Sequence, residues 1–174
     1  AKLTTDQVAA LTTSQVIKLS TDQLAALTTA QLPQMSTANI AALTTDQITA
    51  LTTLQLSKLT TDQVKSITTA DVAKMTSDQI KGLTTDGVIA LSTAQVATLN
   101  SDQVGALSTA QVANMETADV VKLTTAALAG LNSAQIAKLT TDQVAALTTS
   151  QVSKLSTDQL AALTTAQLPQ MSTA

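Results

Sequence analysis

The chain has 174 residues, a formal net charge of −3, and no cysteine, histidine or aromatic residue. Without cysteine there is no disulfide framework, and without cysteine and histidine the usual ligands of zinc are missing. Every basic residue is lysine and the net charge is negative, which argues against electrostatic binding to nucleic acid, because such binding needs clustered lysine and arginine to neutralise phosphates.

One octad repeats from the beginning of the chain to its end, and its first complete copy is LTTDQVAA at residues 3–10. A leucine or a substitute recurs at every eighth position as far as Met171, with no insertion or deletion. Counted from that leucine, the pattern is Leu, Ser/Thr, Ser/Thr, variable, Gln, Val/Ile/Leu, variable, variable. Strict internal repetition of this kind is typical of a solenoid, in which each unit is stabilised by its neighbours.

Each octad carries a start signal for a short helix. With position two as the N-cap, Thr4 is followed three residues later by Gln7, which is the capping-box spacing. Nine of the 12 acidic residues lie at position four, and all nine lysines lie at position seven or eight. This placement suits the helix macrodipole, which favours anions in the first turn and cations in the last.

Two other geometries compete with short helices. In one uninterrupted helix the leucine row would rotate by about 80° per octad, so no apolar face would persist. A β-solenoid suits the Thr and Val content, but the many Ala, Gln and Asp residues and the four glycines argue against it. We therefore predict an all-α solenoid, a superhelix of short capped helices with one helix per octad, which buries positions one and six; a β-solenoid is the alternative.

A second level of order groups the octads into blocks. Met35, Met75 and Met115 replace leucine at intervals of 40 residues and close the blocks 3–42, 43–82 and 83–122. Residues 123–138 are degenerate, and 139–174 restart the array as a near copy of its beginning. We predict that residues 1–174 form a single continuous octapeptide-repeat array, a fragment of a longer protein, with the methionines in its core. That one block equals one superhelical turn is a further hypothesis.

Several residues depart from the octad pattern. Pro33 and Pro169 occupy position seven, where a helix interior would lose a hydrogen bond, so these octads should be shortened or bent, and whether they are hinges stays open. Gly87 replaces the capping glutamine, and Gly130 is expected to end its helix.

The residue types in this chain support few kinds of catalytic or metal-binding site. An activated hydroxyl needs a base held within reach by a third group, and the lysines lie at the opposite end of each octad from the Thr pair. No segment matches the EF-hand loop or the glycine-rich calcium-binding nonapeptide. We therefore assign no catalytic, cofactor-binding or metal-binding residue, and we expect neither an enzyme nor a cofactor.

The segments LTTDQVAALTTSQV (3–16), LTTDQITALTTLQL (43–56) and LSTAQVATLNSDQV (91–104) resemble LTTxQ-type octapeptide arrays of very large proteobacterial surface or secreted proteins. Those proteins are often labelled adhesins or haem-utilisation proteins. The resemblance implies a bacterial extracellular or cell-surface location. The haem label finds no support here, because histidine, cysteine and tyrosine are absent.

The expected function is a structural repeat module, a spacer or stalk or a display surface of a large adhesin-like protein. Its expected partners are neighbouring repeats of the same chain and an unidentified surface or protein ligand, with no nucleic acid. No membrane span is expected, since no stretch approaches about 20 apolar residues. The alternative is an ice- or surface-binding protein that uses its repeated Thr rows.

Overall fold

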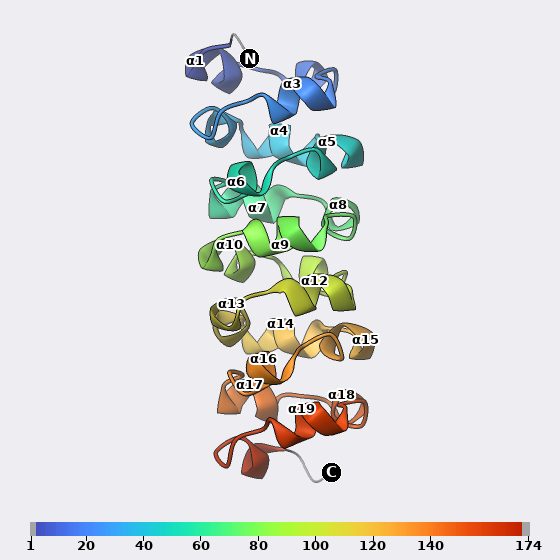
Figure 1. Ribbon diagram of the computed structural model, residues 1–174. Helices are drawn as coiled ribbons and strands as arrows, with labels where there is room; N and C mark the ends of the chain where they lie inside the picture. The colour runs from blue at the N-terminus through green and yellow to red at the C-terminus, as the bar shows by residue number, and fades with distance from the viewer. Residues whose placement is uncertain (1–2, 172–174) are drawn as a thin grey trace. The chain divides into compact units, whose positions relative to one another are not determined.

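The computed structural model describes residues 3–171, and within them short helices follow one another with no strand. One octad supplies each helix, as predicted, so the all-α fold class is confirmed and the β-solenoid alternative is excluded for these residues (Figure 1). The helices are α1 (Thr5–Ala9), α2 (Thr13–Val16), α3 (Thr21–Ala25), η1 (Leu32–Gln34), α4 (Thr37–Ala41), α5 (Thr45–Thr49), α6 (Thr53–Leu56), α7 (Thr61–Ser66), α8 (Thr69–Val72), α9 (Ser77–Gly82), α10 (Thr85–Ile89), α11 (Thr93–Val96), α12 (Ser101–Ala106), α13 (Thr109–Asn114), α14 (Thr117–Lys122), α15 (Thr125–Leu128), α16 (Ser133–Ile136), α17 (Thr141–Ala145), α18 (Thr149–Val152), α19 (Thr157–Ala161) and η2 (Leu168–Gln170).

The helices begin where the capping box predicts. Thr4 has an extended backbone, its hydroxyl accepts a hydrogen bond from the Gln7 backbone N–H at 3.2 Å, and the Gln7 Oε1 accepts one from the Thr4 N–H at 2.9 Å. The same reciprocal pair recurs along the array, with Asn100 and Asn132 supplying the cap oxygen in two octads. Because these bonds satisfy backbone groups that the first turn leaves unpaired, each α-helix starts at octad position three, whereas η1 and η2 start at position six.

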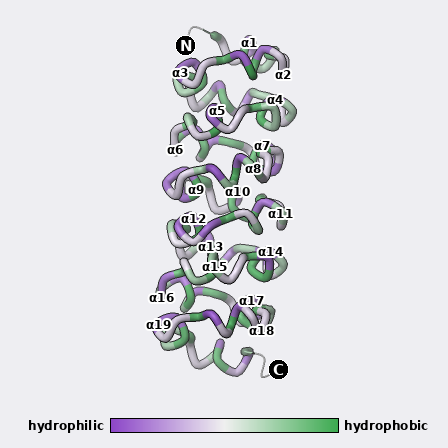
Figure 2. The backbone as a smooth tube through the Cα atoms, turned by 90° about the vertical axis from the view of Figure 1, so that its right-hand side faces the viewer, coloured by the Kyte–Doolittle hydropathy of each residue, from purple (hydrophilic) through white to green (hydrophobic). Residues whose placement is uncertain are grey.

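The core consists of the residues at octad positions one and six, as predicted. Ile48 and Leu51, for example, are 0% and 3% exposed, and Met35, Met75 and Met115 are buried like the leucines they replace. Position five is also buried through most of the described residues, which the sequence did not predict. In Figure 2 hydrophobic and hydrophilic segments alternate along the tube within each turn, in keeping with this octad pattern.

The described residues form two compact units, one up to Leu91 and one from Ser92 onward. In each unit a helix packs on the helix three octads later: α4 on α7 and α6 on α9 in the first unit, α12 on α15 and α14 on α17 in the second (Figure 1). Hydrogen bonds between successive turns join residues 28 and 31 positions apart. One turn therefore takes three to four octads, and the hypothesis of one turn per 40-residue block is wrong.

The two proline octads are shortened, as predicted. Each forms a 3-10 helix of three residues, η1 and η2, with the proline in its first turn. Proline is tolerated at that place because its missing N–H would have no partner in the helix. The octad around Pro33 keeps its cap, since the Thr28 N–H donates to Gln31 Oε1 at 2.8 Å.

Gly130 has a different role from the expected one. Helix α15 ends at Leu128, at octad position six, and α16 ends at the equivalent residue Ile136 without a glycine after it; no described residue has a positive φ. A Cβ atom built on Gly130 would lie 2.1 Å from the carbonyl oxygen of Ser101. The glycine is therefore required by the close approach of two backbones and not by a left-handed helix end.

We expect Gly130→Ala to lower the free energy of unfolding by about 1–3 kcal/mol, because backbone atoms must move to admit the methyl group. Urea titration followed by circular dichroism measures this change.

Gly87→Ala is the matched control. The nearest atom to its added Cβ is the Thr84 hydroxyl oxygen at 3.2 Å, and alanine favours a helix, so the expected change is within about 1 kcal/mol of zero. Equal losses in both variants would contradict the assigned role of Gly130.

Candidate interaction surface

The glutamine at octad position five makes hydrogen bonds in two directions. In α6 the Gln55 Oε1 accepts from the Thr52 N–H at 2.9 Å, which is the capping bond predicted from the sequence. The Gln55 Nε2 donates to the carbonyl oxygens of Leu27 at 2.8 Å and Leu24 at 3.1 Å, one superhelical turn earlier. One side chain thus caps its own helix and binds the preceding turn.

This arrangement recurs in both units and defines what we call the glutamine ladder. Gln135 in α16, for example, caps its helix through Asn132 and donates to Leu107 O at 2.6 Å and Val104 O at 3.3 Å. Asn39 has a shorter side chain and reaches a single carbonyl, that of Leu11, at 2.7 Å. The glutamines that donate to carbonyls 28 and 31 residues earlier include Gln47, Gln55, Gln63, Gln79, Gln135, Gln143, Gln151, Gln159 and Gln167.

The sequence predicted only the capping half of the ladder, although it contains a signal for the other half. A capping box accepts glutamate as readily as glutamine, yet glutamate never occurs at position five of this chain. Only the amide carries a donor in addition to an acceptor. The exclusion of glutamate therefore indicates that the nitrogen also has a partner.

Asp71 and Asp119 replace the glutamine and lack its amide donor. The Asp71 carboxylate instead accepts hydrogen bonds from two hydroxyls, those of Thr68 on its own cap and Thr45 in α5, both at 2.6 Å. The interaction between the two turns is thus kept with donor and acceptor exchanged.

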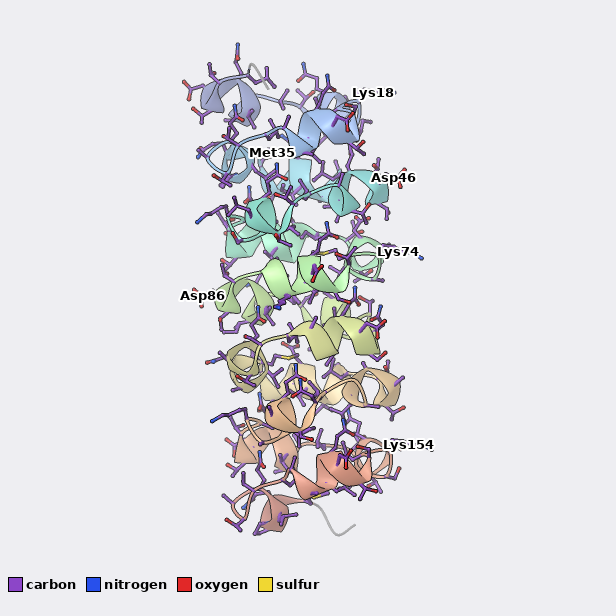
Figure 3. The ribbon with its side chains drawn as sticks, in the orientation of Figure 1. Lys18, Met35, Asp46, Lys74, Asp86 and Lys154 are labelled. Atoms are coloured by element: carbon purple, nitrogen blue, oxygen red, sulfur yellow. The ribbon has the colours of Figure 1, made fainter. Side chains whose placement is uncertain are left out.

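Apart from Asp71 and Asp119, the charged side chains of the described residues lie outside the ladder. Figure 3 shows Asp46, Asp86 and Lys74 directed away from their helices in the first unit. The predicted acidic first turns are confirmed, since Asp6, Asp22, Asp46, Asp62, Asp71, Asp78, Asp86, Asp102, Asp119, Asp142 and Asp158 all lie in one. Among the described residues, no three His, Cys, Asp or Glu side chains gather closely enough to hold a metal ion.

One surface hollow lies between α6 and α9 in the first unit. Its volume is 410 Å³, it is widely open to solvent, and Thr53, Asp78, Lys81 and Gly82 line it. A Cβ atom on Gly82 would lie 2.9 Å from the Thr53 Cβ, so the glycine allows the two helices to approach here. The side chains that line the hollow carry one carboxylate, one ammonium group and one hydroxyl.

Comparison with protein families identifies the repeat. The model of the ALTTAQ repeat matches residues 16–53, 53–85, 85–115, 112–149 and 145–173. The chain belongs to the ALTTAQ repeat family. The hexapeptide occurs unchanged at 26–31 and 162–167, where it contains the core leucine, the capping threonine and the ladder glutamine. No curated protein matches the chain, and over residues 3–171 no helix has the length and apolar character needed to cross a membrane.

The ALTTAQ array contains one buried acid with a perturbed titration. Asp119 is 3% exposed, and the residue before its helix α14 is Glu116. Burial raises the pKa of the Asp119 carboxyl above its usual value of 3.8, and the charge of Glu116 raises that pKa further. The folded state therefore binds this proton more tightly than the unfolded state does.

We expect Gln55→Leu to lower the free energy of unfolding by about 2–4 kcal/mol, because it removes the capping acceptor and the bonds of Nε2 to the preceding turn. Gln15→Leu is the matched control, since Gln15 is exposed and bonds only to its own cap residue among the described residues. It should cost about 1 kcal/mol. Urea titration of both variants measures the difference, and equal losses would show that the ladder adds nothing to capping.

We expect Asp119→Asn to flatten the dependence of stability on pH. A carboxyl whose pKa is raised by folding lowers the free energy of unfolding as pH rises from its unfolded-state pKa through the folded-state value. The asparagine variant should therefore melt at a higher temperature than the parent at pH 7, and the difference should shrink toward pH 3. Thermal melts followed by circular dichroism between these pH values provide the test, and a constant difference would contradict it.

Proposed function

We propose that this ALTTAQ array is a structural module that acts as a spacer or stalk, or as a display surface, in a large extracellular adhesin-like protein at a bacterial surface. The observation that supports the proposal most directly is the glutamine ladder. Its bonds span 28 and 31 residues in the first unit and again in the second. A turn that binds its neighbours in one standard way can be added without a new interface, so the array can set a distance.

The distribution of variable positions supports a display role. Octad positions four, seven and eight differ from octad to octad and are largely exposed, while positions one, five and six are buried in most octads. Substitutions can therefore change the outer surface without changing the core. The ligand in this proposal is an unidentified surface or protein, and the extracellular location rests on the resemblance to surface and secreted arrays.

We also propose that the array has no catalytic activity. The most abundant nucleophile type is the threonine hydroxyl, and at the helix N-caps this hydroxyl is engaged with a backbone N–H, as in Thr4 and Thr60. Histidine, the most common general base for a hydroxyl nucleophile, is absent, and the lysines lie at octad positions seven and eight, at the opposite end of the octad from these hydroxyls.

Binding of ice by rows of threonine is the alternative function, and it has less support. The capping threonines use their hydroxyls within the protein, and the threonines at position three lie in separate helical first turns and not on a sheet. Thermal hysteresis with ice shaping at millimolar protein would support this alternative over the spacer proposal.

Force spectroscopy tests the proposed mechanical role. A chain held by its ends should unfold in successive small steps, because each turn contacts only its neighbours. One turn of 28 residues should release roughly 90–100 Å of extended chain. Gln55→Leu should lower the force of one step, whereas Gln15→Leu should leave the interior steps unchanged.

A single all-or-none unfolding event would contradict a modular spacer. Antibody labelling of intact cells of the source organism tests the location separately, and labelling only after the cells are broken would contradict an extracellular array.

A further inference from the structure

One octad of the chain has glycine at position five, at Gly87 in α10, where the residue is buried. The Gly87 N–H donates to the Thr84 hydroxyl at 3.0 Å, as the glutamine N–H does in a complete capping box. Thr84 also has the extended backbone of the other caps, with φ −65° and ψ 164° against −73° and 155° at Thr52. The helix therefore starts as in other octads, and only the side chain of the glutamine ladder is missing.

The missing side chain leaves backbone groups of two turns without partners. In the spacing of the ladder, a glutamine at this position would accept from the Thr84 N–H and would donate to the carbonyl oxygens of Leu59 and Leu56. Within residues 3–171 no donor binds the Leu59 carbonyl oxygen and no acceptor binds the Thr84 N–H. Leu59 is 7% exposed and Leu56 is 1% exposed. A buried carbonyl without a donor costs free energy, so a ligand that supplies one would bind favourably here.

The turns around Gly87 keep the spacing of the ladder. One octad earlier, Gln79 Nε2 donates to the carbonyl oxygens of Ile48 and Leu51 at 3.0 and 2.8 Å. A Cβ atom on Gly87 would lie 3.7 Å from the Cγ2 atom of Val64 in α7, which is ordinary van der Waals contact. The preceding turn has therefore not moved in to fill the place of the missing side chain.

The octad of Ala127, which also lacks glutamine, is different. Its helix α15 packs on α12, and a Cβ atom on Gly130 would lie 2.1 Å from the Ser101 carbonyl oxygen. The two backbones are too close there for a side chain at position eight, whereas the octad of Gly87 has Ala90 at that position. The turns therefore close up beside Ala127 and stay apart beside Gly87.

We propose that the Gly87 octad is a binding site for a small primary amide, which takes the place of a glutamine side chain between α10 and the preceding turn. The amide oxygen accepts from the Thr84 N–H, and the amide nitrogen donates to the carbonyl oxygens of Leu59 and Leu56, because a primary amide carries both kinds of group. These protein groups are uncharged, and the neighbouring Asp86 side chain is directed away from the helix (Figure 3), so the ligand is neutral. The proposal is independent of the spacer role.

Propionamide is the probe, since it corresponds to the glutamine side chain from Cβ outward. In a titration of the isotope-labelled parent chain followed by nuclear magnetic resonance, the Thr84 N–H signal should shift and saturate. The dissociation constant should lie in the millimolar range, as suits a ligand of about five non-hydrogen atoms. The Thr124 N–H signal, in the octad of Ala127, should show no saturable shift. Propionate and N,N-dimethylpropionamide have no N–H donor and should leave both signals without one.

Two variants locate the ligand. Gly87→Ala supplies the Cβ atom, so this variant should bind acetamide more tightly than propionamide, whereas the parent should prefer propionamide by about fourfold, the value of one buried methylene. Gly87→Gln places an amide of its own in the site and should abolish binding of both. It should also melt at a higher temperature than Gly87→Ala, because both variants lose the glycine but only glutamine completes the ladder.

Three results would overturn the proposal. A Thr84 signal without a saturable shift in propionamide would show that the amide does not enter. Binding that Gly87→Gln retains would place the ligand elsewhere. A melting temperature of Gly87→Gln at or below that of Gly87→Ala would show that the preceding turn leaves no room for an amide.

Discussion

A primary amide buried away from water must satisfy its oxygen and its nitrogen, and the ladder glutamine does so by binding two different parts of the chain. Its oxygen holds the N–H that starts the local helix, as Gln55 does with Thr52, and its nitrogen holds the turn before it, at Leu24 and Leu27. A helix of four to six residues has too few internal bonds to form alone. The start of each helix and the stacking of the turns therefore stabilise each other, and the small aliphatic core needs no aromatic residue to define the register.

The sequence predicted the local features of the fold because the interactions that produce them span three to five residues. The helix starts, the burial of positions one and six, and the short helices at Pro33 and Pro169 all follow from spacing within one octad. The number of octads per turn does not, because a uniform period of eight is compatible with any stacking interval. The sequence could not predict the close approach of the Gly130 backbone to another strand of backbone either, since its partner Ser101 lies in another turn. That the amide nitrogens have hydrogen-bond partners could have been predicted in principle, because glutamate never occurs at position five.

The octads that lack glutamine show how strictly the ladder constrains substitution. Asp71 keeps a bond to the preceding turn only because Thr45 supplies a hydroxyl at the right place. The Gly87 backbone N–H still donates to the Thr84 hydroxyl, but the glycine has no side chain with which to reach another turn. Asp119 places a carboxyl in a buried position, and burial, together with the charge of Glu116, raises the pKa of that carboxyl. Each of these residues lacks the amide nitrogen that would donate to the preceding turn. In a one-dimensional array, unfolding is expected to begin where such bonds between turns are missing.

The ladder also gives every turn a direction. Donors lie on one face and acceptors on the other, so two identical faces brought together would oppose amide to amide or carbonyl to carbonyl and leave both unpaired. Growth of the array by duplication must therefore keep the orientation of the repeat. The near identity of residues 139–174 with residues 3–38 accords with this constraint, because a duplicated segment in the same orientation meets its neighbour through the contact that the octad already makes.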